Sequence, residues 1–196
     1  MIVAAVVALV GLSGTVASLV YLHVAPTGLS PIQNPVSQYG ITPFRGGYRA
    51  ATLSFAVAGA ALFWAVARVG VPGGAERLEL VALGVFALAR AAISWFPMDA
   101  PGTPHTATGR WHGLLATAAF VGIAVAAHSL RSRVAPTVFT GFASTSHFLG
   151  TSLGICLLAM LVVRRGAGQR GIFGAVERVF YLLALTWCTL LAITLL

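Results

Sequence analysis

The sequence predicts an all-α membrane protein: a six-transmembrane-helix, up-and-down bundle with a long polar first loop that caps one face. Two observations carry this prediction. Of the 196 residues, 58% are hydrophobic and only 8% are charged, with a mean hydropathy of +0.92, whereas roughly 25% of residues in an ordinary soluble domain are charged. The apolar residues also gather into six runs of about 20 residues, the length a helix needs to cross a bilayer core about 30 Å thick.

The predicted spans cover residues 2–23, 49–69, 78–97, 109–130, 141–163 and 175–195. The first run has no basic residues before it and no obvious small-x-small cleavage site, so we expect a spanning helix rather than a cleaved signal peptide. The breaks between most spans are short and rich in Gly, Pro or Arg. Short connections join antiparallel neighbours, and residues 1–196 are therefore expected to form a single integral membrane domain.

An even number of spans places both termini on one side of the membrane, here called end X. The opposite side, end Y, receives the loops at 25–47 and 98–108. Near the helix ends the sequence has seven arginines at end Y and four at end X. The positive-inside rule therefore favours end Y in the cytoplasm.

All twelve basic residues are arginines, and the formal charge is +8. Arginine without lysine, with abundant Ala, Val and Gly, is typical of a GC-rich bacterial genome, so we expect the bacterial plasma (inner) membrane. Arginines at the ends of apolar runs extend to the headgroups and attract anionic lipid. Membrane lipids are therefore the expected partners, and nucleic acid is not.

Small residues inside the spans predict close helix contacts. Gly150 and Gly154 form a GxxxG spacing, and such residues let helices approach one another. The contacts expected are those of the bundle itself, with a homo-oligomer as the alternative. Cys156 and Cys188 both lie in apolar runs and are expected to pack as small residues rather than form a disulfide.

Arg90 lies in the middle of the third span, and a charge at that depth is expensive. It is therefore a candidate binding residue, with structural pairing to helix carbonyls or to a nearby Tyr or Asp as an equal alternative. Asp99 and Glu79, at opposite ends of the same span, are the acidic candidates. Each is more than about 10 Å away along the helix axis, at about 1.5 Å per residue.

Three histidines and one carboxylate are assigned to end Y: His23, His105, His112 and Asp99. The Thr-Pro pair at 103–104 predicts an early start of the fourth helix, which would place His105 and His112 on one helix face. Three imidazoles could hold zinc with one open position, and Asp99 could orient a ligand or act as general base. Helix capping by Asp99 and hydrogen bonds from the histidines to backbone or headgroups are the simpler alternatives. No HxxxH or HExxH spacing is present to specify the metal.

The first loop contains four prolines and a series of polar side chains, and it is longer than a plain connection requires. Ser37, with Ser30 as the alternative, is the candidate nucleophile, if a histidine serves as its base. Turn-forming hydrogen bonds explain Ser and Asn beside Pro equally well. Asn34 and Tyr39 in this loop, together with Arg110, complete the candidate binding residues.

His128 and His147 are assigned to end X on neighbouring antiparallel helices. They are the one pair that could supply two axial ligands to a haem.

Two segments, HVAPTGLSPIQNPVSQYG and FPMDAPGTPHTATGRWHG, resemble the uncharacterised multi-pass membrane proteins grouped as domain of unknown function 998. The shared features are the helix count, a first loop with a pattern like VSQYG at 36–40, and an FPxD motif followed by GxxH. The last two correspond here to Phe96, Pro97, Asp99, Gly109 and His112. The resemblance extends from about residue 20 to residue 130. It implies a fold and a membrane location, but no activity.

A fainter resemblance is to membrane hydrolases that combine Ser, Asp and three His. This chain differs from them because it has six spans and no paired HxxxH. The leading hypothesis is therefore non-enzymatic: binding of a lipid or other amphiphile in a polar pocket at end Y, or service as an accessory subunit of a larger membrane complex. The alternatives are a metal-dependent hydrolase of lipid headgroups or esters, and a haem or quinone carrier, so whether the protein is an enzyme stays open.

Overall fold

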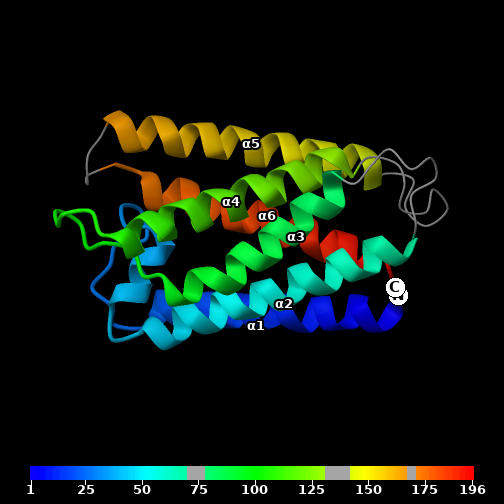
Figure 1. Ribbon diagram of the computed structural model, residues 1–196, viewed down its shortest axis with the longest axis horizontal. Coiled ribbons are helices and arrows are strands. Elements are labelled where there is room, and N and C mark those ends of the chain that lie inside the picture. The colour runs from blue at the N-terminus through cyan, green and yellow to red at the C-terminus, as the bar shows by residue number, and fades with distance from the viewer. Residues whose placement is uncertain (70–77, 131–141, 167–170) are drawn as a thin grey trace.

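The computed structural model describes residues 1–69, 78–130, 142–166 and 171–196, and within these ranges it contains helices and no strand (Figure 1). Six of the helices are long and apolar enough to cross a membrane, which confirms the predicted number of spans. The helices are α1 (Ile2–Val24), α2 (Arg45–Val69), α3 (Leu78–Ala92), α4 (Ala107–Ser129), α5 (Phe142–Gly166) and α6 (Phe173–Thr194), with the 3-10 helices η1 (Val36–Ile41) and η2 (Ile93–Trp95).

The helices run up and down, and neighbours in sequence pack as neighbours in space (Figure 1). Helix α6 also packs against α1, which closes the ring, and it contacts α2 and α4 as well. Both termini lie at one end of the bundle, which is end X, while the connections from α1 to α2 and from α3 to α4 lie at end Y (Figure 1). The predicted up-and-down bundle is therefore confirmed.

Small residues allow the helix backbones to approach closely. A Cβ added to Gly11 in α1 would lie 2.7 Å from the carbonyl oxygen of Ser54 in α2, too close for any side chain. Gly150 in α5 packs directly against the backbone of α4 at His128, whereas nothing lies within 4 Å of a Cβ added to Gly154. The first glycine of the predicted GxxxG pair, Gly150, therefore forms a close contact between two helices of the same bundle.

Helix α4 begins later than the Thr-Pro pair at 103–104 predicts. Its first residue is Ala107, and its N-cap is Thr106, whose side-chain oxygen accepts a hydrogen bond from the Gly109 amide at 3.0 Å. The same hydroxyl donates to Asp99 at 2.6 Å, a bond that holds Thr106 at the cap. His105 therefore lies outside the helix, and the expectation that it shares a helix face with His112 is wrong.

The connection between α1 and α2 contains η1, and its centre is packed rather than polar. Val36 and Tyr39 are each only 1% exposed. The backbone is tied to the start of α6, because the Ala175 amide donates to the Ile32 carbonyl at 2.9 Å. This segment, residues 25–44, is therefore an ordered part of end Y.

Candidate functional site: a cationic cleft at end Y

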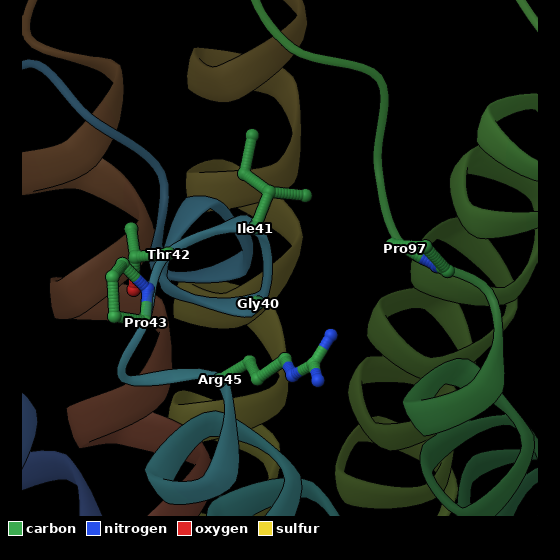
Figure 2. Close-up of a pocket in the computed structure, with 6 residues that line it drawn as sticks. All are labelled: Gly40, Ile41, Thr42, Pro43, Arg45 and Pro97. Atoms are coloured by element: carbon green, nitrogen blue, oxygen red, sulfur yellow. The ribbon is translucent and has the colours of Figure 1, made fainter.

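A cleft opens at end Y between the segment 25–44, the start of α2 and the end of α3. It consists of two hollows of about 580 and 490 Å³ that share part of their lining. Their combined lining is Gly40, Ile41, Thr42, Pro43, Arg45, Gly46, Tyr48, Arg49, Ile93, Ser94, Trp95 and Pro97. Figure 2 shows Arg45 extending from the start of α2 toward the chain at Pro97.

The walls of the cleft are held together by contacts between α2 and its neighbours. Thr52 in α2 and Ser94 in η2 share a hydrogen bond of 2.6 Å between their hydroxyls. The Arg49 guanidinium lies over the ring of Trp95, 4.7 Å from its centroid. Trp95 ends η2, directly after α3, and is 56% exposed. Tryptophan at the end of a span is typical of the membrane–water interface. The cleft is therefore expected at headgroup depth.

Two arginines and no acidic residue line this cleft. Among the described residues, no hydrogen bond or ion pair engages the guanidinium of Arg45 or of Arg49. An open, partly apolar hollow with two cationic donors is suited to an anionic group attached to an apolar body.

Beside the cleft, Arg178 of α6 joins three parts of the chain. Its Nε donates to His23 Nε2 of α1 at 2.7 Å, and its Nη1 donates to the Asn34 carbonyl at 2.9 Å. Its Nη2 donates to the hydroxyl of Tyr39 at 3.2 Å. The preceding residue, Glu177, is 3% exposed and accepts a hydrogen bond from the Val36 amide at 2.7 Å. These bonds fix the segment 25–44, and with it one wall of the cleft.

Asp99 acts as a helix-capping group in this structure. It accepts hydrogen bonds from the hydroxyl and from the amide of Thr106, at 2.6 and 3.1 Å. These two bonds hold the pKa of the Asp99 carboxyl below its usual value. A nitrogen of His105 lies 3.6 Å from the same carboxyl, on a side chain that is 85% exposed. A Cβ on Gly109 would collide with the Asp99 carboxyl, so the FPxD and GxxH motifs meet at this cap.

The three predicted zinc ligands are not brought together. His23 uses both ring nitrogens, donating from Nδ1 to the Leu19 carbonyl at 2.6 Å and accepting from Arg178. His112 is 6% exposed and donates from Nδ1 to the Phe96 carbonyl at 2.7 Å. In the part of the chain that the structure describes, no three His, Cys, Asp or Glu side chains are grouped as metal ligands. The structure therefore gives no support to the predicted His23–His105–His112 zinc site.

The other candidate residues of the first loop make contacts that stabilise the loop itself. The Ser37 hydroxyl donates to the sulfur of Met98 at 3.3 Å, and no histidine bonds it among the described residues. Asn34 accepts from the Ser30 amide and donates to Gln38, at 2.7 and 2.9 Å. Arg110 lies exposed in the first turn of α4, outside the cleft lining.

Arg90 is 2% exposed and donates from Nη1 to the Tyr181 hydroxyl of α6 at 2.8 Å. Its guanidinium also lies over the rings of Phe55 and Tyr181, at 5.5 and 5.3 Å. No ion pair joins it to Asp99 or Glu79, the two acidic partners considered from the sequence, so its direct polar partner is a tyrosine.

The rings of His128 and His147 contact each other directly, with their centroids 4.4 Å apart. In this arrangement no space remains between them for a porphyrin, which axial ligands must bracket from opposite sides. The pair therefore does not support the haem alternative.

The sequence did not single out four residues that line the cleft: Arg45, Tyr48, Arg49 and Trp95. It also missed three residues outside the lining that bond other candidates or hold the segment 25–44: Glu177, Arg178 and Tyr181. Two signals were available. Arg45 and Arg49 stand four residues apart, the spacing of neighbours on one helix face. Glu177 and Arg178 are adjacent charges inside an apolar span, where charges are costly and face the bundle interior.

A family model described as "Protein of unknown function (DUF998)" matches residues 2–194. No curated protein and no solved structure matches the chain. Since the match covers nearly the whole sequence, the chain belongs to this family of multi-pass membrane proteins, as the FPxD and VSQYG segments indicated.

Proposed function

We propose that this protein binds one membrane lipid, or a similar amphiphile, in the cleft at end Y. The observation that carries the proposal is the cleft itself: about 580 Å³ in its larger part, open, and lined by both polar and apolar groups at the depth of Trp95. Ligand sites in proteins span about 300–1,000 Å³. Headgroup atoms would lie among Arg45, Arg49 and Ser94, while the apolar tail would follow the lipid-facing surface of the bundle.

The proposal includes the bacterial plasma membrane as the location, with end Y in the cytoplasm. The seven arginines near end Y, against four near end X, support this orientation.

The binding proposal is tested by filling the cleft from one of its own residues. Gly46 lines the cleft, and a Cβ added there meets nothing within 4 Å. Gly46→Leu therefore introduces an isobutyl group into the cleft without a backbone clash, in the first turn of α2. We expect it to weaken binding of a single phospholipid at least about tenfold, or about 1.4 kcal/mol. The measurement is the apparent dissociation constant from native mass spectrometry of the purified protein titrated with phospholipid.

The matched control is Gly113→Leu. Gly113 also has open space around an added Cβ and lies near end Y in α4, but it does not line the cleft. We expect this variant to bind phospholipid like the wild type. Equal weakening in both variants, or in neither, would remove the cleft as the binding site.

A further inference from the structure

The cleft carries a positive charge that the described residues do not neutralise. Arg45 and Arg49 stand in the first turns of α2 and both line the larger hollow. Like charges four residues apart on a helix repel each other. Of the described contacts, only the ring of Trp95 faces either guanidinium, at 4.7 Å from Arg49.

The carboxylates described at this end are engaged elsewhere. Asp99 is bonded to Thr106 at the start of α4, and Glu177 is bonded to the Val36 amide beneath the segment 25–44. Neither residue lines the cleft. The two guanidinium groups are exposed, and the carboxylates described at this end do not pair with them. An anionic ligand in the cleft would relieve their repulsion.

Planar guanidinium groups bind phosphate oxygens through paired hydrogen bonds, and these are stronger than bonds between neutral groups. The surroundings favour a phosphate carried by a lipid over free phosphate. Trp95 sets the site at the membrane interface, and Ile93, Pro43 and Pro97 add apolar lining next to the arginines.

We infer that the ligand of this cleft is an anionic phospholipid, with its phosphate held between Arg45 and Arg49. This inference rests on the proposed function, because it names the class of amphiphile bound at the same site. The negative charge gives the selectivity: phosphatidylglycerol keeps its net charge, whereas the choline of phosphatidylcholine brings a cation toward the two arginines.

The test compares phosphatidylglycerol, phosphatidylcholine and inorganic phosphate on the wild type and on an Arg45→Gln/Arg49→Gln double variant. Both arginines are exposed, so their replacement leaves the core intact. We expect the wild type to bind phosphatidylglycerol at least about tenfold more tightly than phosphatidylcholine, and the double variant to lose this preference. Arg164→Gln, an exposed arginine on α5 near the same end, is the matched control and should keep it.

Each other outcome overturns a distinct claim. If Gly46→Leu weakens binding but the double variant still prefers phosphatidylglycerol, the lipid site stands and the role of the arginines is wrong. Inorganic phosphate that competes with phosphatidylglycerol at equal concentration would identify a free-anion site and overturn the lipid assignment. If neither Gly46→Leu nor the double variant changes binding, the proposed function fails as well.

Discussion

Arg90 carries a charge into the bundle, where its described hydrogen bond and ring contacts are to aromatic side chains. One hydrogen bond to Tyr181 and the faces of two aromatic rings stabilise it, while its Nε has no hydrogen-bond partner among the described residues. Ring faces attract cations, and the attraction grows when water is excluded. The Tyr181 hydroxyl is therefore a principal stabilising contact of this guanidinium.

Replacing Tyr181 with Phe should make this dependence measurable. The variant keeps the ring but leaves Nη1 of Arg90 without its bond, which should destabilise the fold by about 1–3 kcal/mol. The measurement is the free energy of unfolding in mixed detergent–SDS micelles. Tyr21→Phe, at a tyrosine that is 50% exposed, is the control and should change stability little. A Tyr181→Phe variant as stable as the wild type would mean that other groups support Arg90.

At the scale of single residues, the sequence indicated which side chains are unusual but not what they contact. The capping role of Asp99 and a tyrosine partner for Arg90 were both among the alternatives considered. The three histidines of the predicted zinc site do not meet, because side chains on the same side of a membrane can each find a nearer partner. His23 pairs with Arg178 of α6, and His112 pairs with the Phe96 carbonyl in the connection before α4. Sequence spacing does not place either contact.

Among the structural elements, the segment 25–44 depends on α6 for its position. Arg178 bonds Asn34, Tyr39 and His23, and Glu177 bonds Val36. The segment in turn supplies part of the cleft wall from Gly40 to Pro43. Loosening these bonds should therefore affect both the segment and the proposed lipid site beside it.

An Arg178→Gln variant tests this coupling. The variant loses most of the hydrogen bonds that Arg178 makes to the segment 25–44. Local opening of this segment should then cost about 1.4 kcal/mol less, so the amide hydrogens of residues 32–41 should exchange at least about tenfold faster. Hydrogen–deuterium exchange with mass spectrometry measures this rate, with Arg164→Gln as the control. Arg178→Lys keeps the charge but cannot reach His23, Asn34 and Tyr39 together with the fourth acceptor, the Gly174 carbonyl of the same helix. If the Lys variant fully restores protection, charge alone holds the segment, and the bonding geometry described for Arg178 is not required.

Element boundaries explain why a polar pocket was predicted at end Y but the residues that line the cleft were not. The predicted loop extends to residue 47, through the adjacent glycines Gly46 and Gly47, and the predicted span starts only at residue 49. The helix nevertheless starts at Arg45, and this extra turn places Arg45 and Arg49 along the same cleft. The predicted start of α4 was also too early. Thr103 and Thr106 are both good N-cap residues, and the hydrogen bond from Thr106 to Asp99 favours Thr106 as the cap.

For the whole molecule, hydropathy and chain connectivity were sufficient to predict six spans in an up-and-down order. What they do not determine is the closure of the ring between α1 and α6, which brings Arg178 to His23. Lateral order in a membrane is decided by side-chain packing, because lipid tails are as apolar as the helices themselves.

The proposed orientation leads to a labelling prediction for the whole chain. Cys156 and Cys188 are first replaced by Ala, and a single cysteine is then placed at Thr103, which is exposed at end Y. If end Y is cytoplasmic, a membrane-impermeant maleimide should label Thr103→Cys only after intact cells are permeabilised. Leu196→Cys at end X, 53% exposed in the wild type, should label without permeabilisation. The reverse pattern would contradict the orientation.

The bonds of Arg178 and Glu177 have a consequence for biosynthesis. Their partners lie 139 to 155 residues earlier in the chain. A ribosome adds about 5–20 residues per second, so the first connection must wait many seconds in the membrane before its anchoring helix emerges. A nascent chain halted before α6 would carry five spans and an unsecured segment 25–44. The end of the bundle that holds the cleft is therefore the last to be completed, and the exposed segment could mark an unfinished molecule for proteolysis.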